Sequence, residues 1–282
     1  MKLARYCSPG SQEPHGSMIA GWWHDVSPLT CDIDAALLSD KRLAAVREAT
    51  QSGDPPEIEP VRFGSAICRP GKVACIGLTY CDHADQTEAV IPNGAVVFMK
   101  PPDTMVGANN DLFIPKMRVN TGTEAEPAVV IGRTARYPDS EAGALACVAG
   151  CAISHDVSDR AFQLGRGGHW DKDNSCQTLN PIGPGIVTAD EVPDPQALGL
   201  RLAVNRTPRE QRTTADMIFG GAEIIRGRSD FMVAHPADDI NTGTPAGIAP
   251  GNPYPKPPLR AGDVVELEID GLARQPQIFR SA

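Results

Sequence analysis

Glu124 and Glu126 are two residues apart, just before the apolar run Ala128 to Ile131. Side chains two apart on an extended strand point to the same face, so these carboxylates should converge. Two anions held close together repel each other, and a cation is the simplest way to neutralise them. Asp156 ends a second apolar run, CVAGCAISHD, and could supply a third carboxylate. Carboxylate oxygens suit Mg²⁺ or Mn²⁺, with Ca²⁺ possible, better than they suit zinc.

Spacing alone leaves another reading open, in which Glu124 and Glu126 form the solvated face of an edge strand. Pro127 has no N–H to donate to a neighbouring strand, so it predicts a sheet edge or a strand end just beyond Glu126.

The elements around these residues should be short strands. Runs such as VACIGL, AVVFM, AVVIG and ACVAGCAIS have strand length, and 27 Gly and 26 Pro indicate many turns. Helices are expected at about 33–48, 140–148 and 215–225, the last capped by Thr213 or Thr214. The alternation near residues 265–269, followed by Asp270 and Gly271, predicts a hairpin. The expected fold is mixed α/β, predominantly β.

The 282 residues are enough for one large β-rich domain or two smaller ones. The stretch QSGDPPEIEPV interrupts helical patterning and reads as a linker. We therefore expect a small N-terminal domain and linker over residues 1–70 and a metal-binding, catalytic-type domain over 71–282.

The charge and apolar pattern exclude two classes of partner. A formal charge of −9 and a pI near 5.2 would repel nucleic acid. No apolar run reaches the roughly 20 residues needed to cross a membrane, and the start MKLARYCSPG has no apolar signal core. We expect a cytoplasmic protein with no membrane partner.

Eight cysteines are scattered without a CxxC pair, which predicts buried reduced thiols. A structural zinc site or a nucleophilic Cys81 or Cys176 working with a histidine are the alternatives, but no motif supports a Ser or Cys hydrolase.

From about residue 71 onwards the chain resembles the fumarylacetoacetate hydrolase family. The resemblance is carried by ordered segments: KVACIGLTYCDHA, VVFMKPPD, EAEPAVVIGR, VAGCAISHDVSDR, RGGHW, NPIGPGIVTADEVPDPQ, TADMIFGGAEII, NTGTPAG and LRAGDVVELEIDGLA. It implies a mixed β-sandwich roll with a small N-terminal domain, and usually a homodimer. It also implies a metal on Glu124, Glu126 and Asp156. Members cleave, decarboxylate, hydrate or isomerise small keto acids and 1,3-dicarbonyls, for which a metal can stabilise an enolate.

The resemblance also implies roles for further residues. Arg160 and Gln163 match positions that face the substrate, where a guanidinium can bind a carboxylate. The alternative for Arg160 is a surface salt bridge. Lys100 and Thr244 match substrate-side positions too, although either could be structural. His83 retains the place of a water-activating histidine, and Asn174 falls on a catalytic position that is a lysine in relatives.

This chain departs from the family pattern near the expected chemistry. The replacements are Thr79 for Asn, Gln86 for an acid, Asn174 for Lys, Gln177 for Asp, and His155 and His169 for Asn and Gln. Neutral Gln86 orients and stabilises a charged imidazole less well than a carboxylate would, and neutral Asn174 stabilises a developing anion less well than a lysine. Losing one such group typically costs on the order of 100-fold in rate. Lys172 and Glu88 could substitute. His155 and His169 could each act as a new acid or base, or could be hydrogen-bonding residues.

Two functions follow as hypotheses. The first is a metal-dependent lyase, hydrolase or isomerase acting on a 1,3-dicarbonyl or β-keto acid, with decarboxylation or tautomerisation easier to retain than water attack. The second is a non-catalytic relative that keeps the fold as a binding or scaffold protein.

Overall fold

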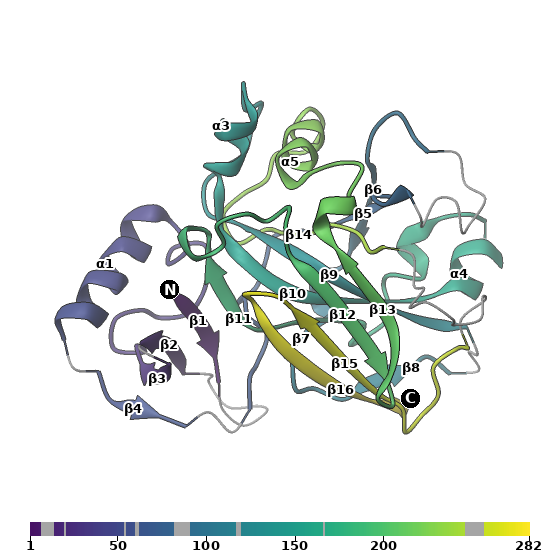
Figure 1. Ribbon diagram of the computed structural model, residues 1–282, viewed down its shortest axis with the longest axis horizontal. Coiled ribbons are helices and arrows are strands. Elements are labelled where there is room, and N and C mark those ends of the chain that lie inside the picture. The colour runs from purple at the N-terminus through teal and green to yellow at the C-terminus, as the bar shows by residue number, and fades with distance from the viewer. Residues whose placement is uncertain are drawn as a thin grey trace.

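The computed structural model describes residues 1–6, 14–19, 21–53, 55–59, 62–81, 91–116, 120–165, 167–245 and 257–282. It is built mainly from strands, as predicted. An eleven-stranded sheet has the order β4-β3-β2-β1-β11-β10-β9-β14-β5-β6, with β7 paired to β11, and a five-stranded sheet has the order β13-β12-β15-β16-β8. The smaller sheet crosses in front of β9 and β10 (Figure 1).

The strands of the larger sheet come from both halves of the chain. They are β1 (Lys2–Arg5), β2 (His15–Ile19), β3 (Trp22–Asp25), β4 (Glu57–Ile58), β5 (Val73–Gly77), β6 (Val96–Lys100), β7 (Met105–Val106), β9 (Thr121–Ile131), β10 (Val148–Asp159), β11 (Asn180–Thr188) and β14 (Asp239–Asn241). The smaller sheet contains β8 (Leu112–Ile114), β12 (Gly199–Val204), β13 (Thr207–Thr213), β15 (Val264–Ile269) and β16 (Ala273–Ser281). The Asp270–Gly271 hairpin is confirmed, because β15 and β16 pair antiparallel and Gly271 takes a φ of +74°.

The helices are short and lie at the periphery. They are α1 (Asp40–Ser52), α3 (Glu141–Leu145), α4 (Arg160–Gly165) and α5 (Gly221–Ser229), with 3-10 turns η1 (Pro102–Thr104), η2 (Trp170–Lys172), η3 (Ala189–Glu191) and η4 (Thr214–Asp216). The first expected helix starts later than predicted, because the Asp34 carboxylate accepts the N–H groups of Ala36 and Leu37 in a turn. The helix expected over 215–225 is divided, because Met217 instead forms a β-bridge with Tyr80.

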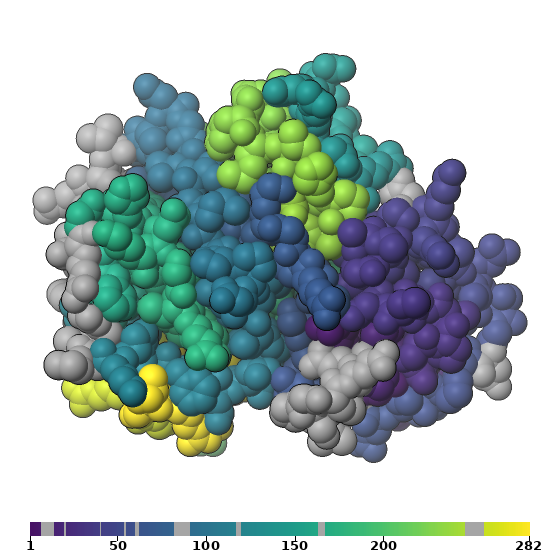
Figure 2. Space-filling view, turned by 180° about the vertical axis from the view of Figure 1, so that it is seen from behind, coloured from purple at the N-terminus to yellow at the C-terminus, as the bar shows by residue number. Residues whose placement is uncertain are grey.

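The N-terminal residues extend the larger sheet. β1 pairs antiparallel with β11, and β2, β3 and β4 continue outward from it. With α1 they form one end of the molecule, opposite α4 (Figure 1), and the same end is purple and dark blue in Figure 2. Strands from both sides of residue 70 share one sheet. The division into two domains at that residue stays a prediction.

Between the two sheets lies the largest apolar cluster. It includes Ala125, Ile153 and Val157 from the larger sheet and Leu200, Leu202 and Leu267 from the smaller. Because strand side chains alternate, burial of these residues on one face turns Glu124, Glu126 and Asp156 to the other. The apolar core thereby sets the direction of the carboxylates.

Pro127 lies inside β9, so the expected end or edge of that strand is wrong. The strand that ends there is its neighbour β14, whose last pair is Asn241 with Ala128. The carbonyl of Pro127 accepts the N–H of Thr242, just beyond that pair. Pro127, which has no N–H to donate, therefore lies just beyond the last residue pair between β9 and β14, where no donor is needed.

Seven cysteines in the described residues are free thiols, as expected, but the expectation that they are buried is wrong for most of them: only Cys75 and Cys151 of these seven are buried, and Cys31 and Cys81 are exposed. Cys7 lies outside the described residues. In the described part of the chain, no helix has the length and apolar character needed to span a membrane.

Candidate metal and substrate site

The central strands β9 and β10 bring the three predicted carboxylates to one pocket. Asp156 pairs directly with Glu124, and Ser154 pairs with Glu126. Directly paired residues on one face have Cβ atoms about 5 Å apart, so these side chains are neighbours. Glu124, Glu126 and Asp156 all line a small pocket, together with Arg160, Asn174 and Thr244. The reading as a solvated edge strand is wrong, since β9 lies between β10 and β14 and Glu126 and Asp156 are each only 2 % exposed.

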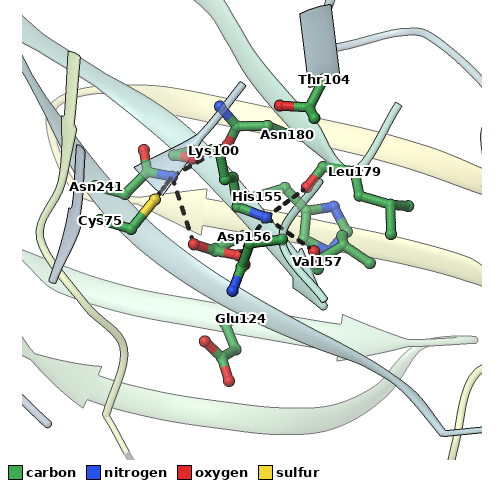
Figure 3. Close-up of polar contacts among 12 residues, drawn as sticks. Cys75, Lys100, Thr104, Glu124, His155, Asp156, Val157, Leu179, Asn180 and Asn241 are labelled. Carbon is green, nitrogen blue, oxygen red and sulfur yellow. Dashed lines mark hydrogen bonds and ion pairs between the residues drawn. The ribbon is translucent and has the colours of Figure 1, made fainter. Parts of the chain in front are cut away.

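Each carboxylate has its own protein partner. Glu124 forms an ion pair with Arg160, Asp156 Oδ1 lies 2.9 Å from Lys100 Nζ, and Glu126 Oε2 accepts the N–H of Gly243 at 2.8 Å. The carboxylate of Glu124 lies apart from the Lys100–Asp156 pair (Figure 3). With the side chains so turned, no three His, Cys, Asp or Glu residues within the described ranges form a group that could hold a metal ion.

Electrostatics nevertheless favours a cation among these acids. Burial, together with the repulsion of Asp156 and Glu124, raises the pKa of Glu126 well above its ordinary value. Burial also raises the pKa of Asp156, where Lys100 opposes the change and Glu124 adds to it. A divalent cation would relieve the same repulsion. The donor set is all oxygen and lines one pocket, so it fits a hard cation in chemistry, provided that Glu124 turns from Arg160.

Of the two roles that the sequence left open for Lys100, its contacts favour the structural one. It is buried and donates to the carbonyls of Val157 and Leu179 as well as pairing with Asp156. Burial disfavours its charge, but the attraction of Asp156 prevails and its pKa is raised. Lys100 is therefore a charged partner of Asp156 behind the pocket.

Asn174 lines the pocket with its amide oriented by the main chain. Its Nδ2 donates to the carbonyl of Trp170 at 2.8 Å. The other polar atom of the amide is the acceptor Oδ1. That oxygen is buried and has no hydrogen-bond partner within the described residues. The position therefore offers an acceptor, where a lysine would offer a cation.

The remaining predicted residues divide into three groups. Thr244 lines the pocket and its hydroxyl contacts the carbonyl of Ala125 at 3.4 Å. Gln163 lies in α4, in a stretch whose side chains are not described. His83, Gln86 and Glu88 lie outside the described residues, so their proposed roles stay predictions.

Neither His155 nor His169 faces these acids. His155 alternates with Asp156 along β10, and its ring contacts Thr123 Oγ1 and Gln277 Oε1 on the opposite face of the sheet. His169 is exposed and lies outside the pocket lining. Lys172 lines a separate surface hollow with Phe162, Asp171 and Ser175, so it does not replace the lysine missing at 174.

Sequence reasoning missed several residues that shape the site. Asn241 contacts Asp156 Oδ2, Gly243 binds Glu126, and Trp170 and Phe98 form an apolar wall with ring centroids 5.3 Å apart. The segment NTGTPAG contains the first two, so its Asn and Gly could have been singled out along with Thr244.

A comparison with protein families finds one whose profile, described as the C-terminal part of fumarylacetoacetate (FAA) hydrolase, matches residues 72–277. The chain belongs to the fumarylacetoacetate hydrolase family. This confirms the resemblance seen in the sequence and the mixed, predominantly β fold. It also confirms the chain as an enzyme of a family of metal-dependent hydrolases and isomerases.

Relatives of this family member align along its whole length. A Burkholderia multivorans protein named in general terms as a hydrolase is 40% identical over 282 residues, covering 100% of both chains. The structure of fumarylacetoacetate hydrolase from Exiguobacterium antarcticum has a TM-score of 0.83 at 27% identity, with 100% of both chains covered. Maleylpyruvate hydrolase from Sphingobium sp. SYK-6, in complex with manganese (II) ion and pyruvate, shares the fold with a TM-score of 0.81 at 24% identity and 100% coverage of both chains.

Proposed function

We propose that this member of the family is a divalent-metal-dependent enzyme that acts on a β-keto acid or 1,3-dicarbonyl by decarboxylation or tautomerisation. The observation that carries the proposal is a pocket lined by three acids and Arg160, with an amide oxygen of Asn174 where water attack would need a cation. Glu124, Glu126 and Asp156 would hold Mg²⁺ or Mn²⁺, with Ca²⁺ possible. The manganese bound by the Sphingobium enzyme supports this choice. A bound cation would polarise a carbonyl oxygen of the substrate.

Arg160 would recognise the substrate carboxylate. Its side chain lines the pocket and forms an ion pair with Glu124. A bound cation would compete with Arg160 for the Glu124 carboxylate. A guanidinium has five N–H donors in a planar fork, so it can bind a substrate carboxylate in bidentate fashion. Gln163 and Thr244 would also face the substrate, as the resemblance implies.

Asn174 favours reactions that need no second anion stabiliser from the protein. Carbon–carbon hydrolysis places negative charge on an attacked carbonyl, and an acceptor oxygen nearby would oppose it. Decarboxylation and tautomerisation place the developing charge on the substrate carbonyl oxygen, where a cation held by the three acids would supply the stabilisation. His83 would serve as the proton carrier if its ring reaches the pocket.

The test is turnover with a panel of oxaloacetate, acylpyruvates and other β-keto acids in Mg²⁺ or Mn²⁺. We expect Glu124→Ala to lower kcat/KM by about 100-fold or more, because it removes a metal-binding carboxylate. Glu141→Ala, which changes an exposed glutamate in α3, should leave turnover unchanged.

Three outcomes separate the alternatives. Hydrolysis of acylpyruvates with no decarboxylation would reject the proposed reaction while keeping the family activity. A protein that binds metal and turns over no substrate would favour the binding or scaffold role. Inactivation by a thiol reagent and not by a chelator would favour a cysteine nucleophile, although Cys176 packs against the core between the sheets.

The assembly and location also remain proposals. The resemblance implies a homodimer, which sedimentation of the purified protein would test. The cytoplasmic location is proposed from the apolar pattern of the sequence. A fragment covering residues 71–282 would test the proposed domain division by its ability to fold alone.

A further inference from the structure

Lys100 is placed as a fixed support for one carboxylate. It is the last residue of β6, pairs with Val73 of β5, and is 1 % exposed. Its Nζ atom lies 2.9 Å from Asp156 Oδ1, 2.9 Å from the carbonyl of Val157 and 3.3 Å from the carbonyl of Leu179. Figure 3 shows the amino group among these acceptors. An ammonium has three donors, so all of them are engaged and none is left for a substrate.

Asp156 is contacted from a second direction by β14. Asn241 Nδ2 lies 3.5 Å from Asp156 Oδ2, at the limit of a hydrogen bond, and 3.1 Å from Asn180 Oδ1. Asn180 also accepts the hydroxyl of Ser154 at 3.0 Å. Strands β6, β10, β11 and β14 therefore all contribute to the position of this one side chain.

Removing Lys100 would have two opposite effects on a cation at the pocket. The loss of a positive charge would leave the three acids more strongly negative and would favour cation binding. The loss of the amino group would leave Asp156 free to turn, and groups that orient metal-binding side chains typically contribute about 10- to 100-fold to metal affinity. The two effects predict opposite signs, so a measurement can separate them.

We propose that Lys100 is a positioning residue that acts through Asp156, holding this carboxylate in the orientation that serves the pocket. The inference rests on the proposed metal-dependent function. It reassigns Lys100 from substrate contact to support of the acid behind the pocket.

The chain offers a matched control in Lys72. Its Nζ lies 2.9 Å from Oδ2 of buried Asp238, and its main-chain N–H donates to Oδ1 of the same residue at 2.9 Å. This pair is outside the pocket lining. Lys72→Met thus removes a lysine from a lysine–aspartate pair without touching the acids of the site.

The experiment compares Mn²⁺ affinity, by titration followed with electron paramagnetic resonance, for the wild type, Lys100→Met and Lys72→Met. We expect Lys100→Met to lose about 10- to 100-fold in affinity although its site is more negative. Lys72→Met should stay within about twofold of the wild type, because its partner does not face the pocket. Unchanged or tighter binding by folded Lys100→Met overturns the inference.

A second variant separates position from charge. Lys100→Arg keeps the charge but cannot place one nitrogen among the same three acceptors, so it should also lose Mn²⁺ affinity. Full affinity in Lys100→Arg would overturn the inference, and this variant decides the matter if Lys100→Met does not fold.

A crystal structure of the variant gives a readout that needs no metal. The Asp156 carboxylate should take a different orientation in Lys100→Met, and an unchanged orientation would reject the positioning role. If the wild type bound no Mn²⁺, the proposed function would fail, while this structural comparison would still judge Lys100.

Discussion

At the scale of single residues, the site is distinguished by a buried acid beside Asn174. Asp173 is 0 % exposed, and no other described residue supplies a hydrogen bond to its carboxylate. Burial raises the pKa of Asp173 to about 7, although the nearby charge of Arg160 opposes the change. Asp173 is not among the residues that line the pocket, whereas its neighbour Asn174 offers an acceptor oxygen there where a lysine would supply a cation, which agrees with chemistry other than water attack.

Asp173→Asn should stabilise the protein relative to the wild type by more at pH 8 than at pH 5. The folded wild type keeps a proton up to about pH 7 that the unfolded chain loses near 3.8, so its stability falls as pH rises through that window. The asparagine variant avoids this loss. Thermal unfolding at both pH values measures it.

Asp216→Asn, at an exposed aspartate, is the control and should show no such dependence. An equal effect of Asp173→Asn at pH 5 and pH 8 would contradict the raised pKa.

At the scale of elements, the turn after β14 holds Glu126. Gly243 has a φ of +89°, and its N–H donates to Glu126 Oε2 at 2.8 Å. A Cβ atom there would lie 2.0 Å from Thr79 Oγ1 and 2.6 Å from the carbonyl of Ile76. Glycine is required both by the left-handed backbone and by the close approach of the segment around Thr79. The unusual Thr79 is thus a packing neighbour of the turn that binds Glu126.

Gly243→Ala should destabilise the protein by roughly 3 kcal/mol or more, since it adds a steric clash to the backbone cost. It should also weaken Mn²⁺ binding, because relief of the clash would shift the turn and move its backbone N–H away from Glu126. Denaturant unfolding and metal titration are the measurements.

Gly262→Ala is the matched comparison. Gly262 has a φ of +97° but nothing within 4 Å of the added Cβ, so only the backbone cost of about 1–2 kcal/mol applies. Equal losses in the two variants would show that the clash at Gly243 is relieved.

At the scale of the whole molecule, His155 joins the two sheets. Its Nδ1 contacts Gln277 Oε1 of β16 at 3.0 Å, and its ring meets Phe279 edge-on with centroids 6.0 Å apart. Burial lowers the pKa of His155 to about 3, so the ring is neutral between the layers. It is a structural residue of the interface, which answers the suggestion that it acts as an acid or base at the site.

The neutral ring should make the fold sensitive to acid. The unfolded chain takes up a proton near pH 6.5 and the folded chain only near 3, so His155 contributes stability that is lost as pH falls through this window. In His155→Gln, unfolding free energy should fall less steeply between these pH values than in the wild type.

His24→Gln changes a half-buried histidine in β3 and should leave the wild-type slope unchanged. The same slope in the wild type and His155→Gln would contradict a buried neutral ring.

The sequence by itself determined the features that depend on neighbours along the chain. The two-residue spacing placed Glu124 and Glu126 on one face, the Asp-Gly pair marked the hairpin, and ordered motifs identified the family. Alternation along β10 also puts His155 and Asp156 on opposite faces, a consequence that the suggestion of His155 as an acid or base at the site did not take into account. These are local properties, because strand periodicity and turn geometry act over a few residues.

Only the tertiary structure decided which distant groups meet. Lys100 and Asp156 are 56 positions apart by their residue numbers, and neither spacing nor residue type predicted their ion pair at 2.9 Å. The Arg160–Glu124 pair and the contact of Asn241 with Asp156 are likewise set by the order of strands in the sheet. Partner choice in a sheet depends on register and on burial of the whole core, so it becomes fixed only when the strands assemble.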